Sequence, residues 1–123
     1  MVGTATKDDP RGTDQLLAAL ADPTRRRIVE MLSEAPRKAS EIHRAFPIAA
    51  PAVSRHLRIL RDAGLITARN VPGDNRVRLY TLEQRRLDAL GAWTADVSRH
   101  WQQQLESFKD YVALRSTAGP AKK

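Results

Sequence analysis

The residues most able to do chemistry in this sequence are the cations of one short stretch, PAVSRHLRILRDAGLI at residues 51–66. Its basic side chains are Arg55, His56, Arg58 and Arg61, and its first acid is Asp62. Apolar side chains at Val53, Leu57 and Leu60 recur at helical spacing, so we expect one buried face and an opposite cationic face. Arginine can donate two hydrogen bonds to guanine in the major groove of DNA. The stretch therefore predicts a helix that binds DNA.

Positive charge is concentrated around this helix. The whole chain of 123 residues carries a formal net charge of +7, and residues 37–78 hold nine Lys or Arg against three Asp or Glu. A localised basic patch indicates a polyanionic partner. The alternative is that these basic residues only face solvent and keep the domain soluble.

Composition excludes several classes of site. The chain has no cysteine, so disulfides, thiolate metal sites and a cysteine nucleophile are excluded. Apolar runs of only a few residues do not span a membrane. The polar N-terminus does not resemble a secretory signal, so we expect a cytoplasmic protein without a membrane partner.

The elements around the cationic helix follow from capping and breaking residues. We expect a disordered arm over 1–12, a short helix opened by Thr13 or Asp14, and a helix capped by Asp22 with Pro23 at its first position. Three arginines follow Pro23 in its first turn, where a solvated face is the simplest interpretation. KASEIHRAF, residues 38–46, predicts a further short helix.

A tight turn then leads to the cationic helix, predicted over 50–63 and closed by Gly64. Two short helices joined in this way are typical of a helix-turn-helix. Alternating residues at 65–69 and 77–81, separated by turn formers at 70–76, predict a hairpin, and we define the wing as residues 66–81. The fold class is therefore mainly α with a small β-hairpin, a winged helix-turn-helix.

From about 83 to 114 the pattern is one long helix with an apolar stripe. The stripe contains both tryptophans of the chain, and its predicted interface residues are Leu90, Trp93, Val97, Trp101, Leu105 and Phe108. A second copy of the chain is the simplest partner, so we expect a homodimer. The alternative is a helix folded back on its own domain. We expect one domain over 13–114, which includes this dimerisation helix, and a basic flexible tail over 115–123.

The candidate DNA-binding residues are Lys38, Ser40, Ser54, Arg55, His56, Arg58, Arg61, Arg76 and Arg78. Ser54 and Arg55 lie at the end of the helix that usually meets base edges, Arg58 suits bases or phosphate, and Arg61 suits phosphate. His56, beside buried Leu57, fits a structural or phosphate-contacting role better than base reading.

The remaining candidates surround this helix. Arg76 at the hairpin tip suits the minor groove, and Arg78 shares its strand face. Lys38 and Ser40, near a helix start, suit phosphate.

Metal binding and catalysis have little support. Asp96 and His100 lie four residues apart and could share a metal with Asp88 or Glu106 of a second chain. One histidine per chain is, however, weak evidence for a zinc or nickel site. A surface pair is the plainer interpretation. No catalytic spacing or phosphate loop is visible. We therefore expect no enzyme, cofactor or metal, and the sequence identifies no effector.

Three motifs resemble the ArsR family of bacterial winged-helix repressors: ALADPTRRRIVEML at 19–32, PAVSRHLRILRDAGLI at 51–66 and RNVPGDNRVRLYTL at 69–82. The resemblance covers roughly residues 14–112. It implies a homodimer joined by terminal helices, with a recognition helix in the major groove and a wing in the minor groove or on the backbone. It also implies an effector that weakens DNA binding and so derepresses the chain's own or neighbouring genes.

Two departures from the family pattern matter. KASEIHRAF lacks the thiols of the family's soft-metal site, so the chain is similar to the cysteine-free branch. Ala49-Ala50 replace a frequent Ser-Gln pair, which shifts base reading to Ser54, Arg55 and Arg58. The alternative functions are a winged-helix protein-interaction module and a metal-responsive repressor with its site on the C-terminal helices.

Overall fold

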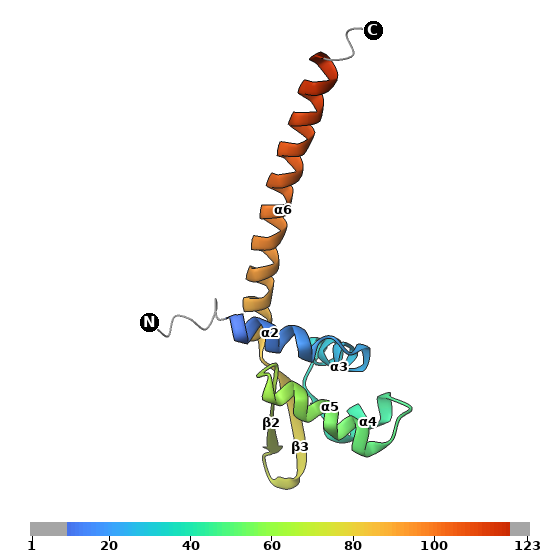
Figure 1. The fold of residues 1–123 in the computed structure, drawn as a ribbon. Helices are drawn as coiled ribbons and strands as arrows, with labels where there is room; N and C mark the ends of the chain where they lie inside the picture. The colour runs from blue at the N-terminus through green and yellow to red at the C-terminus, as the bar shows by residue number, and fades with distance from the viewer. Residues whose placement is uncertain (1–9, 119–123) are drawn as a thin grey trace. The chain divides into compact units, whose positions relative to one another are not determined.

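The structure is a computed structural model that describes residues 10–118. The chain divides into two compact units, one ending at Leu90 and the other beginning at Gly91. In the first unit, α4 and α5 lie side by side and the hairpin of β2 and β3 projects away from the helices (Figure 1). No helix among the described residues is long and apolar enough to cross a membrane.

The first helix of the described residues, α2, spans Pro10–Ala19 and begins earlier than its sequence predicts. The expected cap at Thr13 or Asp14 is therefore wrong, and the predicted arm over 1–12 loses its last three residues to the helix. Proline is tolerated in a first turn because the N–H that it lacks has no partner there. The rest of the predicted arm, residues 1–9, lies outside the described residues.

The next helix, α3, spans Pro23–Glu34 and begins as predicted. The Asp22 Oδ2 atom accepts a hydrogen bond from the Arg25 backbone N–H at 3.1 Å, and Pro23 occupies the first position. Ile28, Val29 and Leu32 are buried. The cap fixes where α3 starts, and these apolar residues fix which face turns to the core.

The helix-turn-helix consists of α4, Ala39–Ala45, and α5, Ala50–Asp62. At the start of α4 the Lys38 backbone N–H donates to Glu41 Oε1 at 2.7 Å. At the end of α5, Gly64 adopts a φ of +77°, its N–H donates to the Arg61 carbonyl, and the Leu65 N–H donates to the Leu60 carbonyl. This pair of bonds is a Schellman motif, and it confirms Gly64 as the predicted helix stop.

Three antiparallel strands form the sheet in the order β1-β3-β2, with β1 at Arg37–Lys38, β2 at Ile66–Val71 and β3 at Asp74–Leu82. The two-residue β1 was not predicted, because so short a strand has no alternation to detect. The predicted loop over 70–76 is also wrong. The strands continue to a two-residue turn, Pro72-Gly73, in which Gly73 has a φ of +85°. Proline followed by a left-handed glycine is the residue pair of a type II turn.

The hydrophobic core of the first unit joins α2, α3, α4 and α5 to the sheet. Its largest fully buried side chains are Leu16, Ile28, Ile42, Val53, Leu60, Leu65 and Ile66. Val53, Leu57 and Leu60 supply the contribution of α5. Because these residues recur at the predicted spacing, the opposite face of α5 is left to solvent.

The last helix, α6, spans Gln84–Ala118 and crosses from one unit to the other. In the first unit, the Arg86 Nη2 and Nε atoms donate to the Ala63 carbonyl at 3.1 and 3.3 Å, next to the end of α5. The helix continues four residues past the predicted end at 114, so the predicted tail over 115–123 is wrong for residues 115–118. Residues 115–118 contain neither glycine nor proline. Residues 119–123 of that tail lie outside the described residues.

Candidate nucleic-acid interface

The predicted cationic face of α5 is present in the structure. Ser54, Arg55, Arg58 and Arg61 are all exposed, whereas the side chains of the opposite row are buried. Within the described part of the chain, none of these three arginine side chains has a hydrogen-bond or ion-pair partner. Three guanidinium groups on one helix therefore keep their full donor capacity for a ligand outside the chain.

His56 lies on a different side of α5 from these arginines. Its side chain is only 18% exposed, and its Nδ1 lies 3.2 Å from Arg25 Nη1 and 3.9 Å from Asp22 Oδ2. The ring is therefore held against the junction of α2 and α3. This position fits the structural role that we favoured for His56 over base reading.

Asp22 lies beside this histidine and is ionised more easily than an ordinary aspartate. Burial raises the pKa of its carboxyl group, but the backbone N–H of Arg25, the neighbouring His56 and the backbone N–H of Thr24 outweigh it. The net pKa is below the usual 3.8. The carboxylate is therefore charged at neutral pH, as an N-cap at a positive helix end favours.

The wing presents two predicted cations. The Arg76 side chain is 92% exposed, and its Nε lies 3.5 Å from Asp74 Oδ1, which also accepts the Arg76 backbone N–H at 3.0 Å. Arg78 is exposed and shares a strand face with Tyr80, which is buried in the core. Because alternate residues of a strand point to the same side, Arg78 extends the face of β3 that packs on the helices.

Lys38 and Ser40 are exposed at the start of α4. Two further cations were not selected from the sequence, although the charge count included them. Arg44 on α4 and Arg69 on β2 are exposed and have no partner among the described residues. Their positions outside the buried rows of helix and strand could have identified them. We define the basic surface as Lys38, Arg44, Arg55, Arg58, Arg61, Arg69, Arg76 and Arg78.

Arg26 and Arg27 in the first turn of α3 are exposed, as the predicted solvated face requires, but Arg25 is half-buried. Arg25 Nε and Nη2 donate to the Ala19 and Ala18 carbonyls at 2.6 and 3.3 Å, and Arg26 Nη1 donates to the Leu20 carbonyl at 2.8 Å. These carbonyls end α2 and need partners. The two arginines therefore stabilise the corner between α2 and α3.

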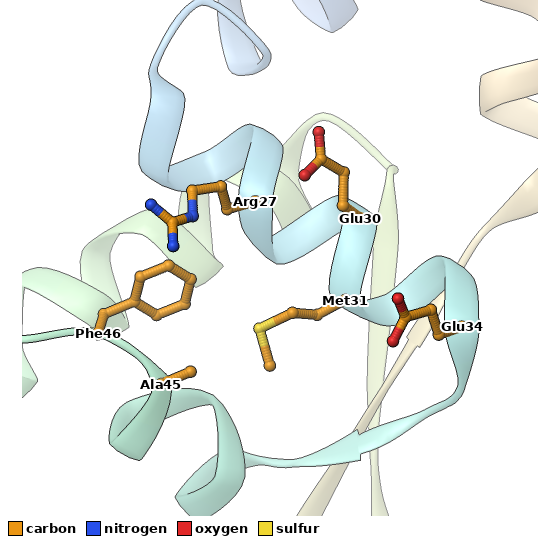
Figure 2. Close-up of a pocket in the computed structure, with 6 residues that line it drawn as sticks. All are labelled: Arg27, Glu30, Met31, Glu34, Ala45 and Phe46. Atoms are coloured by element: carbon orange, nitrogen blue, oxygen red, sulfur yellow. The ribbon is translucent and has the colours of Figure 1, made fainter.

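Arg27, the third arginine, faces α4. Its guanidinium lies over the Phe46 ring, 5.8 Å from the centroid, at one end of a hollow between α3 and α4 (Figure 2). Met31 points into this hollow, which has a volume of about 360 Å³ and is also lined by Glu30, Glu34 and Ala45. Its rim mixes both charges, so the lining selects no single class of ligand.

The second unit presents the predicted apolar stripe on α6. Trp93, Val97, Trp101 and Phe108 are exposed, at 41 to 63% of their surface, and Leu105 is half-buried. Leu90 differs from them because it packs against the core of the first unit. Exposed aromatic side chains along one helix are a surface suited to a protein partner.

Charged pairs of α6 lie off this stripe. Asp96 Oδ1 accepts hydrogen bonds from Arg99 Nη1 and Nη2 at 3.0 and 2.9 Å, so the expected pairing of Asp96 with His100 is wrong. An arginine one turn away offers a planar pair of donors that histidine lacks. No group of three potential metal ligands occurs among the described residues.

The chain is similar to known transcriptional regulators over its helix-turn-helix and beyond. Residues 22–68 match the family model described as bacterial regulatory protein, arsR family. The HTH-type transcriptional regulator Rv2034 of Mycobacterium tuberculosis is 38% identical over 102 residues, which are 83% of this chain and 90% of that protein. The HTH-type transcriptional repressor SmtB of the same species is 40% identical over 73 residues, 59% of this chain and 52% of that protein.

A solved structure shows the same fold. The crystal structure of the ArsR family transcriptional regulator RHA00566 matches with a TM-score of 0.68 and 33% sequence identity. The match covers 76% of this chain and 93% of that one. The winged helix-turn-helix predicted from the sequence is therefore confirmed.

Proposed function

This chain belongs to the ArsR family of bacterial transcriptional regulators, and on that premise we propose that it is a homodimeric repressor of its own or neighbouring genes. The family consists of DNA-binding regulators, and the chain is a DNA-binding transcriptional regulator and not an enzyme. We further assign residues to parts of the DNA and assign the dimer contact to α6.

In this proposal α5 enters the major groove. Ser54 and Arg55 contact base edges near its N-terminal end, Arg58 contacts a base or phosphate, and Arg61 contacts phosphate. The observation that carries the proposal is the row of exposed arginines without partners on α5, opposite its buried row. A guanidinium paired within the protein would have to give up that pair to bind DNA, so it would contribute less binding energy. The three guanidinium groups of α5 have no such pair within the described part of the chain.

The wing and α4 hold the phosphate backbone on either side of this helix. Arg76, in β3 close to the hairpin turn, reaches the minor groove, where cations are favoured, and Arg78 lies two residues along the same strand face. Lys38, Ser40, Arg44 and Arg69 bind phosphates. His56 is assigned no DNA contact, because its ring nitrogen faces Arg25 and Asp22.

The stripe on α6 provides the dimer contact. Trp93, Val97, Trp101, Leu105 and Phe108 of one copy pack against the same residues of another, as in a self-complementary twofold interface. Two copies then present two α5 helices to half-sites about one turn of DNA apart.

The test measures DNA binding by the purified chain through the fluorescence anisotropy of labelled duplexes. One duplex comes from the DNA upstream of the chain's own gene, and the other has a random sequence. We expect tight binding to the upstream duplex. Arg55→Ala should weaken that binding by about 10- to 100-fold, the usual effect of losing one bidentate base contact. Binding to the random duplex should change far less.

Arg85→Ala is the matched control. Arg85 is 89% exposed and lies in the first turn of α6, outside the basic surface, so this variant loses the same charge elsewhere. Equal weakening by both variants would show a general effect of charge and would refute base reading by Arg55. Equal affinity of the wild-type protein for both duplexes would refute an operator in the upstream DNA.

A further inference from the structure

We propose that Arg25 is a positioning residue for DNA recognition, because it joins the end of α2 to His56 in the middle of α5. The inference rests on the proposed reading role of α5. Arg25 makes no contact with DNA in this proposal. It holds α5 so that Ser54 and Arg55, the two residues before His56, meet the base edges in one orientation.

The Arg25 guanidinium contacts two elements at once. Nε and Nη2 donate to the Ala19 and Ala18 carbonyls at the end of α2, and Nη1 lies 3.2 Å from the Nδ1 atom of His56 on α5. Its own backbone N–H is held by Asp22 at 3.1 Å. Since arginine can only donate, Nδ1 of His56 is the acceptor in this contact.

His56 is the only polar side chain of α5 that is not exposed. The remaining contacts of α5 with the core come from apolar residues such as Val53, Leu57 and Leu60. The hydrophobic contribution of such contacts is non-directional, so it specifies the orientation of a helix less sharply than a hydrogen bond does. A hydrogen bond has a preferred distance and angle, so the contact with Arg25 restricts rotation and sliding of α5.

Asp22 Oδ2 also lies 3.9 Å from the His56 Nδ1 atom. The other polar contacts to α5 within the described part of the chain lie at its C-terminal end. The Gln15 side chain donates to the Asp62 carbonyl at 3.2 Å, and Arg86 donates to the Ala63 carbonyl. At the opposite end the N-cap residue, Ala49, makes no side-chain cap. The Arg25–His56 contact is therefore the side-chain hydrogen bond closest to Ser54 and Arg55, which read bases in the proposed function.

Arg26 provides a natural control beside Arg25. Its Nη1 also donates to the end of α2, at 2.8 Å from the Leu20 carbonyl, but no contact joins it to α5 within the described part of the chain. Loss of Arg26 therefore removes a cap on α2 and leaves the link to α5 in place. Comparison of the two arginines separates a capping role from a positioning role.

The experiment measures selectivity, the ratio of affinities for the upstream duplex and a random duplex, together with the melting temperature of each variant. Arg25→Ala and His56→Leu should each lower selectivity about tenfold, and the double variant should lower it little further because both remove one contact. Arg26→Ala should keep selectivity within about twofold of wild type while it lowers the melting temperature. His56→Gln should recover most of the selectivity, since its amide oxygen can accept from Arg25.

Equal loss of selectivity in Arg25→Ala and Arg26→Ala would overturn the proposal, as would full selectivity in His56→Leu. If Arg25→Ala fails to fold, the His56→Leu and His56→Gln pair gives the same decision. Arg55→Ala is measured in parallel. If Arg55→Ala lowers selectivity and His56→Leu does not, the positioning role alone is refuted. If Arg55→Ala has no effect, the proposed reading of bases by α5 is refuted as well.

Discussion

Among single residues, Asp22 both caps α3 and lies beside His56. The interactions that cap the helix stabilise the charged carboxylate and hold its pKa below 3.8. The folded state therefore binds fewer protons than the unfolded state in this pH region, so stability rises with pH there. This contribution is complete above the ordinary pKa and is lost as the pH falls through the lower pKa of the folded state.

We predict that Asp22→Asn flattens this pH dependence. Asparagine retains a side-chain acceptor for the Arg25 N–H but does not ionise, so the stability of the variant should fall less steeply than that of wild type below about pH 4. Urea unfolding at a series of pH values from 3 to 6 measures this. Asp22→Ala, which does not ionise and also loses the cap, should be less stable than Asp22→Asn by about 1 kcal/mol across the range. Parallel profiles of stability against pH for wild type and Asp22→Asn would contradict the assignment of this pH dependence to Asp22.

The cations show what single residues can and cannot reveal in a sequence. The exposed arginines of α5 followed from their spacing relative to Val53, Leu57 and Leu60. The roles of Arg25 and Arg26 did not, because their partners are backbone carbonyls of the preceding helix, and the His56 partner of Arg25 lies 31 residues away. Such partners depend on the angle between α2 and α3, which no local pattern encodes.

Among the elements, α5 depends on Gly64 at its C-terminal end. Gly64 has a φ of +77°, and a Cβ added there would lie 3.2 Å from the Arg86 Nε atom. Gly64→Ala should therefore cost about 1 to 2 kcal/mol of unfolding free energy through backbone strain, with displacement of Arg86 adding to it. Chemical denaturation measures the change.

Gly91→Ala is the control for Gly64→Ala. Gly91 lies within α6, and a Cβ there would meet nothing within 4 Å. This variant should gain about 0.5 to 1 kcal/mol, because alanine is the better helix former. An unfolding free energy of Gly64→Ala equal to that of the wild-type protein would contradict the role of Gly64 in ending α5.

The contribution of the wing to DNA binding can be measured from the salt dependence of the affinity. Arg76 is proposed to contact the DNA backbone or minor groove, so Arg76→Ala should weaken binding to upstream and random duplexes alike. It should also reduce the slope of log affinity against log salt by about 0.9. Asp74→Asn removes the neighbouring negative charge from the same hairpin, so it should not reduce the slope. An unchanged slope in Arg76→Ala would place this arginine away from the DNA.

The helices and the hairpin were predictable from capping residues and periodicity, but the third strand was not. Arg37–Lys38 pairs with Tyr80 and Leu79 of β3, and its two residues carry no strand pattern of their own. The turn was also placed too broadly, because Asn70, Asp74 and Asn75 are common turn residues that here belong to strands. Cross-strand pairing overrode their local preference.

For the whole molecule, the exposed apolar stripe of α6 is the surface best suited to association. Its spacing was visible in the sequence, and the structure places Trp101 and Phe108 at 61 and 63% exposure on the single chain. Asp96 and Arg99 pair with each other on another side of the helix. A helix with one aromatic side and one charged side suits association with another copy through the aromatic side.

We predict that Trp101→Glu converts a dimer into a monomer. The wild-type protein should have twice the chain mass of 13.7 kDa in light scattering, whereas a glutamate facing an apolar partner surface loses hydration without gaining an ion pair. Gln103→Glu adds the same charge to an exposed residue on the opposite side of α6 and should leave the dimer intact. Because a monomer contacts one half-site at a time, Trp101→Glu should weaken operator binding by about 100-fold or more. A monomeric wild-type protein, or a dimeric Trp101→Glu, would assign the stripe to another partner and leave DNA reading to a single α5.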